Sequence, residues 1–347
     1  MITKDILKHL AHKHVFLGFD AFVDAIARPV RTGSALHPES YFDGMSDFAL
    51  YLQAKGNMSC SVELEEITEK LGGNMAIVAN ALSGLGVQTH CVGPFGLPST
   101  HPAFRNMALH CDLYSVGNPG ACTALEFNSG KLMLGTNRDL NHLDYAAILA
   151  HVSVETLRAL AAKSEILCFL NWSELPCATD IFIGFRDNVL RHIPGKRLLF
   201  VDLSDCSRRT AADIQELMDV LAEMPENVDV ALSMNKNEEN ILTEALGIPQ
   251  TDCISKGQWL AARYGFAHIF FHDRHMNHHV RREAAFSHEA AFIENPVLLS
   301  GAGDNFNAGL IAGMLMDLPG NALLTFAIET ARHYLQHGAS LAAADCN

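Results

Sequence analysis

Apolar positions along the chain follow two alternating patterns: short continuous runs, and longer segments with the spacing of an amphipathic helix. The runs, which are typical of buried strands, cover residues 15–19, 87–92, 166–170, 198–202, 228–233 and 267–272. The helical segments cover residues 74–85, 154–163, 211–223, 238–246 and 255–264. Strands that alternate with helices predict an α/β fold in which helices cover both faces of a mainly parallel central sheet, a three-layer α-β-α sandwich.

Three segments depart from this alternation. In residues 25–31, 59–70 and 121–136 apolar and polar positions alternate, and Asn128-Ser129-Gly130-Lys131 has the composition of a hairpin turn. We expect these segments to form a small β-lid beside the main sheet, made of approximately residues 25–40, 57–70 and 119–138. Because no repeat and no Pro/Gly/Ser-rich linker divides the chain, residues 1–347 are predicted to form a single domain.

Composition and charge exclude several classes of partner. The chain has 347 residues, 49% of them hydrophobic and 18% charged, which is typical of a well-packed globular protein. Its formal net charge of −14 argues against binding to nucleic acid or to an anionic membrane. No apolar run approaches the roughly 18 residues of a membrane span, and none of the nine cysteines forms a CxxC pair. These features favour a cytoplasmic protein with reduced thiols, and exposed lid strands could pair two copies into a homodimer.

The strongest candidate for chemistry is a glycine turn that leads into an apolar helix, Ser300-Gly301-Ala302-Gly303-Asp304. Helix N-termini expose unpaired N–H groups and bind anions, so Gly301, Ala302 and Gly303 are expected to form an anion hole. Asp304 beside that hole is a candidate base that takes a proton from an attacking hydroxyl. This combination favours phosphoryl transfer, whereas a structural interpretation would make it a plain capping turn.

Four motifs in a fixed order resemble the ribokinase-like superfamily of sugar and nucleoside kinases, the PfkB family. They are the strand end at residues 18–24 (GFDAFVD), Gly72-Gly73-Asn74 at the start of a helix, an Asn-x-x-Glu at Asn235 and Glu238, and the glycine turn before Asp304. The resemblance covers nearly the whole chain. It implies a ribokinase-like fold, ATP as phosphoryl donor, Mg²⁺, and a sugar-like small molecule as acceptor.

Residues at the ends of predicted strands are the candidates for substrate binding. Asp20 and Asp24 end the first strand, in the crevice where α/β sheets bind ligands, and could accept hydrogen bonds from substrate hydroxyls. Gly72 and Gly73 would let the backbone approach a ligand closely. The alternative is that the two carboxylates are turn or cap residues.

Further candidates lie close to these positions. Asn74 is a substrate contact or an N-cap, and Asn171 is a substrate contact by its place after a strand. Trp172 is either a sugar-stacking or a core residue. The charged side chains near the lid either recognise a substrate phosphate or are solvated: Arg28, Arg31, Lys131 and Arg138.

The nucleotide side rests on the resemblance. It assigns Asn235 to the nucleotide phosphates and Glu238 to Mg²⁺ through water, because Mg²⁺ keeps several of its own waters. The structural alternative is a capping box in which Asn235 begins a helix and Glu238 is its partner. A Walker lysine motif is absent, which excludes P-loop chemistry.

The chain also departs from the family pattern. Ile77 stands where relatives usually have Asn, and residues 18–26 and 72–80 are more similar to the ADP-dependent sugar kinase branch, so ADP is an alternative donor. His272 and Arg274 occupy the place of a Thr-x-Gly near the nucleotide phosphates, and Arg274 could contact a phosphate. For the four histidines between 272 and 279 we favour altered nucleotide affinity over a metal centre.

The sequence therefore predicts a kinase that transfers the γ-phosphoryl of ATP to a hydroxyl of a sugar or sugar-like molecule, with Asp304 as general base. Two alternatives remain open, an ADP-dependent sugar kinase and a non-catalytic sensor of a sugar or nucleotide. A sugar, a sugar acid, a sugar phosphate and a nucleoside all remain possible acceptors.

Overall fold

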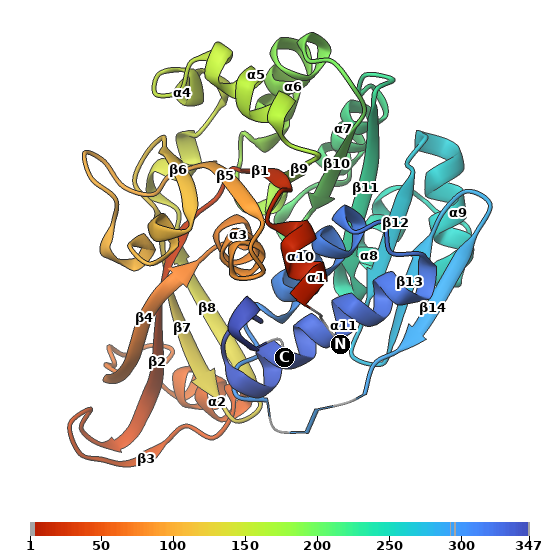
Figure 1. Ribbon diagram of the computed structural model, residues 1–347. Coiled ribbons are helices and arrows are strands. Elements are labelled where there is room, and N and C mark those ends of the chain that lie inside the picture. Colours follow the sequence, from red (N-terminus) through yellow and green to blue (C-terminus); the bar gives the residue numbers. More distant parts are fainter. Residues whose placement is uncertain (1–3, 292, 295, 346–347) are drawn as a thin grey trace.

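Across residues 4–291, 293–294 and 296–345, which the computed structural model describes, the chain forms a nine-stranded sheet and a five-stranded sheet (Figure 1). The strand order of the large sheet is β14-β13-β12-β11-β10-β9-β1-β5-β6. Its strands are β1 (His14–Gly18), β5 (Gln88–Gly93), β6 (Cys111–Ser115), β9 (Ile166–Phe169), β10 (Arg197–Asp202), β11 (Val228–Asn235), β12 (His268–His272), β13 (Met276–Val280) and β14 (Ala285–Glu289). Strands from β6 to β12 pair in parallel, and the β13–β14 hairpin continues the sheet in antiparallel fashion. The expected mainly parallel sheet is confirmed.

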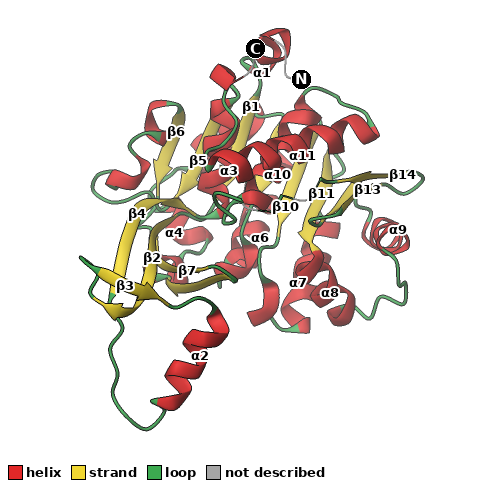
Figure 2. Cartoon of the chain, turned by 90° about the horizontal axis from the view of Figure 1, so that it is seen from below, coloured by secondary structure: helices red, strands yellow, loops and turns green. Residues whose placement is uncertain are grey.

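Helices cover both faces of this sheet (Figures 1 and 2). One face carries α1 (Lys4–Leu10), α3 (Asn74–Gly84), α10 (Ala302–Leu315) and α11 (Gly320–His337). The other face carries α4 (Tyr145–Leu149), α5 (Val154–Lys163), α6 (Ala178–Asn188), α7 (Ala211–Ala222), α8 (Lys236–Ala245) and α9 (Cys253–Tyr264). Alternate strand residues serve the two layers, because successive side chains of a strand point to opposite faces. Phe16 packs into one core, and its neighbours Val15 and Leu17 pack into the other. The three-layer sandwich is therefore confirmed.

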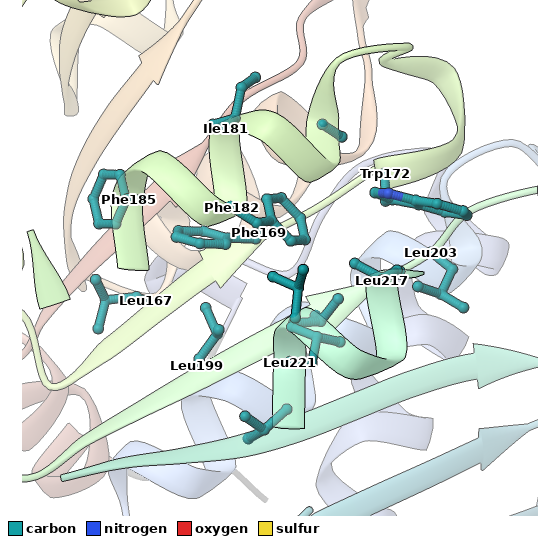
Figure 3. Close-up of a cluster of buried hydrophobic side chains, with 14 of the residues drawn as sticks. Leu167, Phe169, Trp172, Ile181, Phe182, Phe185, Leu199, Leu203, Leu217 and Leu221 are labelled. Carbon is teal, nitrogen blue, oxygen red and sulfur yellow. The ribbon is translucent and has the colours of Figure 1, made fainter. Parts of the chain in front are cut away.

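Aromatic side chains fill the core on the α5–α9 side (Figure 3). The ring of Phe169 lies 4.8 Å from that of Phe182 and 5.1 Å from that of Phe185, centre to centre. Trp172 is fully buried in the same cluster, and its indole N–H donates a hydrogen bond to Thr179 Oγ1 (3.0 Å). Of its two interpretations, the core role is the one that the structure supports.

The small sheet is the lid. Its strand order is β3-β2-β7-β8. Strand β4 pairs antiparallel with residues 22–29 of β2, of which 22–27 also pair with β7, whereas β3 pairs with residues 30–33. The strands are β2 (Phe22–Gly33), β3 (Pro38–Tyr41), β4 (Leu64–Gly72), β7 (Gly120–Phe127) and β8 (Gly130–Thr136), which fall in and beside the three segments expected to form it. A helix absent from the expectation, α2 (Met45–Ala54), packs on this sheet through Phe48, which contacts Phe42 and Phe127.

Candidate active site

A cleft of about 700 Å³ lies between the carboxyl ends of the large sheet and the lid. Most of the expected site residues line it, although they come from both sheets and from three helix N-termini. They are Asp24, Gly73, Asn74, Asn171, Asn235, Glu238, His272, Gly301, Gly303 and Asp304. The expected residues outside the lining are Asp20, Gly72, Arg274 and Ala302.

The glycine turn before α10 has the geometry of an anion site. Gly301 adopts a φ of +98°, a left-handed conformation that favours glycine, and no described side chain caps the helix. The N–H of Ala302 donates to the carbonyl of Leu299 (3.3 Å), so it is not free for a ligand. Asn305 Nδ2 donates to the carbonyl of Gly301 (2.8 Å) and holds the turn. The uncapped first turn of α10, with Gly303 in the cleft wall, is thus left to bind an anion.

Tyr334 in α11 supports this turn from behind. Its hydroxyl donates to the carbonyl of Ser300, the residue before Gly301. A Cβ on Gly301 would lie 2.8 Å from the same hydroxyl oxygen, which leaves no room for a side chain. Burial raises the pKa of Tyr334, so the hydroxyl remains a donor.

Asp304 occupies the first turn of α10 and keeps part of its surface open to the cleft. Its pKa is raised well above the usual value, first by burial and then by the charges of Asp202 and Asp20. The Lys131 ammonium from the lid opposes this shift. A carboxylate with a raised pKa, beside an anion-binding turn, is suited to accept a proton from a hydroxyl.

Asp20 lies beneath the cleft. It is fully buried and accepts hydrogen bonds from Asn171 Nδ2 (2.7 Å) and from the N–H of Met75 (2.8 Å). Burial raises the pKa of Asp20 to about 7. A Cβ on Gly73 would lie 2.6 Å from Asp20 Oδ2, so the glycine makes room for this carboxyl group. Asp20 therefore accepts a hydrogen bond from the first turn of α3 and orients the side chain of Asn171. Asn171 itself lines the cleft.

Asp24 and Gly72 form a similar pair on the lid side. Asp24 is 5% exposed and faces the cleft, and a Cβ on Gly72 would lie 2.3 Å from its Cγ. Burial raises the pKa of Asp24, and the charges of Lys70 and Lys131 oppose this effect. Gly72 therefore serves the placement of a carboxylate rather than a direct approach of the backbone to the cleft.

Asp202 is a cleft residue that sequence reasoning missed. It ends β10 and accepts hydrogen bonds from Asn307 Nδ2 (2.6 Å), Asn74 Nδ2 (3.2 Å) and the N–H of Ser204 (2.9 Å). Asn307 in turn accepts from Ser233 Oγ (2.7 Å). Burial raises the pKa of Asp202 to about 6. The sequence did hold a signal for Asp202, because it stands at the end of a buried strand. The same kind of position was the reason for selecting Asp20 and Asp24.

Asn235 and Glu238 form the capping box at the start of α8. The Asn235 side chain accepts from the N–H of Asn237 (2.8 Å) and of Glu238 (3.0 Å), and Glu238 Oε2 accepts from the N–H of Asn235 (2.8 Å). Burial, and then the charge of Asp202, raise the pKa of Glu238. Both residues line the cleft, so the capping role and the expected nucleotide role are compatible.

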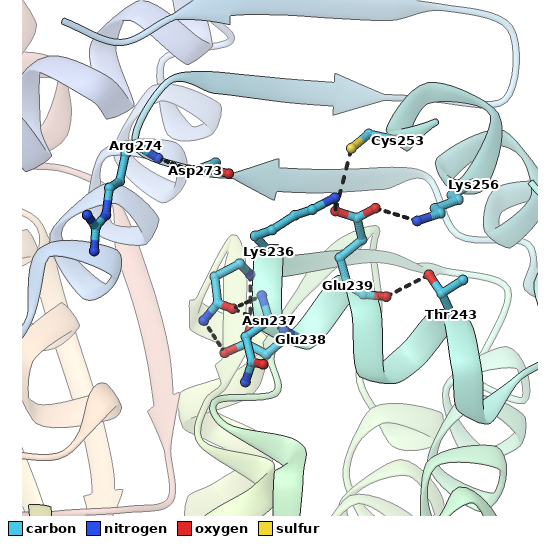
Figure 4. Close-up of polar contacts among 10 residues, drawn as sticks. Lys236, Asn237, Glu238, Glu239, Thr243, Cys253, Lys256, Asp273 and Arg274 are labelled. Carbon is cyan, nitrogen blue, oxygen red and sulfur yellow. Dashed lines mark hydrogen bonds and ion pairs between the residues drawn. The ribbon is translucent and has the colours of Figure 1, made fainter. Parts of the chain in front are cut away.

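Glu239, the residue after Glu238, anchors α8 to α9 through a buried ion pair (Figure 4). The Glu239 carboxylate, 2% exposed, pairs with Lys256 Nζ (2.7 Å) and with Lys236 Nζ (2.8 Å). Since removal of one partner of a buried pair is strongly destabilising, this cluster fixes the helix that carries Asn235 and Glu238.

His272 and Arg274, which stand in place of the Thr-x-Gly of relatives, differ in their position relative to the cleft. His272 lines the cleft at the end of β12, and its Nε2 is buried without a partner among the described residues. Burial lowers the pKa of His272 to about 4, so the ring is neutral. Arg274 is exposed beyond the strand and outside the cleft lining (Figure 4). Within the described residues, no group of three or more His, Cys, Asp or Glu side chains could hold a metal ion directly.

Residues 2–346 match the model of a family described as prokaryotic ketohexokinase. The chain belongs to this family. A curated relative, the ketohexokinase of Haloferax volcanii, is 26% identical over 328 residues, which cover 93% of this chain and 87% of the relative.

Two solved structures show how far the fold is shared. The adenosine kinase of Sinorhizobium meliloti has a TM-score of 0.67 at 19% identity, and the match covers 96% of this chain and 98% of that one. The ribokinase of Thermotoga maritima has a TM-score of 0.63 at 12% identity, with 95% and 94% covered. The predicted ribokinase-like fold is confirmed.

Membership of the prokaryotic ketohexokinase family also confirms the predicted activity. The protein is a carbohydrate kinase, a phosphotransferase with an alcohol group as acceptor, and sugar kinases of this kind generally use ATP with Mg²⁺. The alternative of a non-catalytic sensor loses its support. Along the described part of the chain, none of the helices combines the length and apolar composition that a membrane span needs.

Several cleft residues of this family member were not among the expected ones. They come from the lid and from loops after the strands of the large sheet: Cys122, Met133, Asn137, Glu174, Ser204, Asp205 and Arg208. Lys131 also lines the cleft, whereas Arg28, Arg31 and Arg138 do not. Single positions on lid strands cannot be assigned to the cleft before the pairing of β2 with β4, β7 and β8 is known.

Proposed function

We propose that this member of the prokaryotic ketohexokinase family phosphorylates a hydroxyl of a ketohexose, with ATP as donor and Asp304 as general base. The family and the curated relative support the class of acceptor. The mechanism rests on the position of Asp304 at the uncapped N-terminus of α10. Asp304 lines the same cleft as the expected substrate and nucleotide residues.

The reaction forms one bond and breaks one. The sugar oxygen attacks the γ-phosphorus as its proton passes to the Asp304 carboxylate, and the bond between the γ-phosphorus and the bridging oxygen breaks to release ADP. The N–H groups of Gly301 and Gly303 and the α10 dipole stabilise the negative charge of the transferred group, whereas the N–H of Ala302 is already bonded to the carbonyl of Leu299. Proximity of base, acceptor and donor supplies much of the rate enhancement.

The acceptor sugar binds on the lid side of the cleft. Asp24 accepts hydrogen bonds from its hydroxyls, and the amides of Asn74 and Asn171 hold it in register. Asn171 Oδ1 is buried without a partner among the described residues, which leaves an acceptor for a sugar hydroxyl. Closure of the lid would exclude water, which competes with the sugar as acceptor.

The residues of the nucleotide side fit a polyphosphate with Mg²⁺. The uncapped turn at Gly303 offers N–H groups, and the buried, unpartnered Nε2 of His272 offers one more polar contact. Glu238 is a carboxylate of the same wall that would act on the metal through water. When bound, Mg²⁺ offsets the phosphate charge and orients the transferred group.

The lid also supports a homodimer. The described lid strands and α2 hold many of the exposed large apolar side chains, among them Leu50 (66% exposed), Ile67 (54%) and Leu134 (51%). Lys131 and Met133 of β8 line the cleft, so Leu132 and Leu134 point to the opposite, outer face. A second copy on that face would cover this apolar surface.

A panel assay tests the proposal. Purified protein is incubated with Mg-ATP and, separately, with Mg-ADP, in the presence of ketohexoses, aldohexoses, pentoses and nucleosides, and phosphorylated product is followed by ³¹P NMR. We expect turnover with Mg-ATP and a ketohexose. Turnover only with Mg-ADP would overturn the donor, and product only from an aldose or a nucleoside would overturn the acceptor.

A further inference from the structure

A second cavity of about 300 Å³ lies beside the active-site cleft, and Ile77 lines both. Helix α3 runs from one cavity to the other: Ile77 stands at the shared wall, and Asn80 and Gly84 follow at helical spacing in the second cavity. Tyr334 near the end of α11 and residues 338–340 and 342, which follow that helix, also line the second cavity. Lys70 and His110 also belong to its lining.

This cavity gathers donors that have no partner in the described structure. Lys70 is half-buried, and no described carboxylate forms an ion pair with its ammonium group. Asn80 and Ser340 are half-buried and His110 is exposed, and the side chains of all three make no hydrogen bond to a described residue. A cavity whose lining combines an ammonium group with amide, imidazole and hydroxyl groups fits a phosphate, which offers several charged acceptor oxygens.

Two residues connect this cavity to the catalytic machinery. Tyr334 lines the cavity and donates to the carbonyl of Ser300, next to the anion-binding turn. Lys70 lies directly across the β2–β4 pair from Asp24, and its charge acts favourably on the carboxylates of Asp24 and Asp304. A ligand bound in the second cavity would therefore affect the anion-binding turn and the carboxylates of the active-site cleft without entering that cleft.

We propose that the second cavity binds a phosphate group, either free or as a small monoester, and that its occupancy lowers turnover in the neighbouring cleft. The bound anion pairs with Lys70 and neutralises the positive charge that favours ionised Asp24 and Asp304. Fewer enzyme molecules then hold Asp304 in the form that accepts a proton. Couplings between two sites are typically worth about five-fold or more in an equilibrium, and we expect a loss of turnover of that size.

Equilibrium binding tests the site separately from catalysis. Inorganic phosphate and glycerol 3-phosphate are titrated calorimetrically into the protein, with and without a non-hydrolysable ATP analogue, Mg²⁺ and a ketohexose in the cleft. We expect one probe-binding site that persists when the cleft is filled. The arm with the higher affinity distinguishes free phosphate from a monoester. Binding that disappears when the cleft is filled would overturn the proposal.

Three variants locate the site. Ser340→Trp fills the cavity and His110→Ala removes one donor, and each should weaken probe binding about ten-fold or more, the effect of losing one charge-assisted contact. His151→Ala changes an exposed histidine outside the cavity and is the matched control. In the kinase assay, the monoester should lower wild-type kcat but not that of Ser340→Trp. Wild-type affinity in both Ser340→Trp and His110→Ala would overturn the proposal.

Discussion

At position 304 a single carboxylate meets two opposing demands. It must be ionised to accept a proton, yet burial and the charges of Asp202 and Asp20 raise its pKa well above the usual value. A carboxyl group with a raised pKa stays protonated to a higher pH. We therefore expect kcat/KM to fall as the pH drops through this raised pKa and to level off above it, in a pH profile measured with saturating Mg-ATP.

Replacement of that carboxylate tests its role directly. Asp304→Asn keeps the shape of the side chain but cannot accept the proton, so kcat should fall by a factor of about 10² to 10⁴. The fold should be retained, because no described hydrogen bond depends on this carboxyl group. A coupled assay gives the rate and near-UV circular dichroism gives the fold. A folded variant with wild-type turnover would contradict the mechanism.

Asp20 makes a prediction about stability. Its pKa rises from 3.8 in the unfolded chain to about 7 in the folded protein, because it is buried. The folded state thus binds a proton that the unfolded state has released, and stability falls as the pH rises from about 4 through about 7. The shift is worth at most roughly 4 kcal/mol.

Asp20→Asn removes this dependence. Asn171 Oδ1 has no partner in the described part of the chain, so a flip of the Asn171 amide would satisfy the new side-chain amide. We expect the variant to be more stable than wild type at pH 8, with the advantage shrinking toward pH 4. Urea unfolding at both pH values measures the difference. An advantage that grew toward pH 4 would show that Asp20 is not buried as a neutral acid.

At the scale of the element, the turn before α10 depends on two glycines in different ways. Gly301 has a left-handed φ, and a Cβ there would lie 2.8 Å from the Tyr334 hydroxyl oxygen. Among the described atoms, a Cβ on Gly303 would meet only His272 Cε1, at 3.5 Å. We expect Gly301→Ala to destabilise the fold by about 1–3 kcal/mol and Gly303→Ala to leave stability nearly unchanged. Urea denaturation compares the two. Equal losses would mean that the turn is not held in this conformation.

Elements whose signal is local were predictable from the sequence. The bounds of α5, Val154–Lys163, agree with the expected helix, and the capping box at Asn235 and Glu238 can be read from four consecutive positions. Elements that depend on a partner were not. Helix α2 packs on the lid through Phe48, and its apolar side chains meet a surface that exists only after the lid sheet has formed.

At the scale of the whole molecule, the site was only partly predictable because its contacts are long-range. Asp202 is held by Asn74, 128 residues away, and by Asn307, 105 residues away. Asp20 was expected in the substrate site by its place at a strand end, but it is fully buried and accepts a hydrogen bond from Asn171, 151 residues along the chain. A strand end gives the neighbourhood of a carboxylate. The layers packed above it decide whether that carboxylate faces the cleft.

The proposed homodimer would form through the outer face of the lid. A monomer would leave Leu134, Ile67 and Leu50 in water, and their burial between two copies is favourable by roughly 25 cal/mol per Å² of apolar surface. Leu134→Asp places a charge on this face, opposite the cleft-lining residues of β8, and should shift the protein toward the monomer. Sedimentation velocity over a range of concentrations measures the shift.

Leu149→Asp is the matched control, because Leu149 is also exposed (39%) but ends α4, outside the lid. It should leave the oligomeric state of the wild type unchanged. Separation of the subunits would also remove the support for the lid strands, so Leu134→Asp should raise the KM for the sugar more than that for ATP, whose expected contacts come from α8, α10 and β12. A wild-type protein that sediments as a monomer at every concentration would refute the dimer, and the lid would then close on the substrate as a single unpaired sheet.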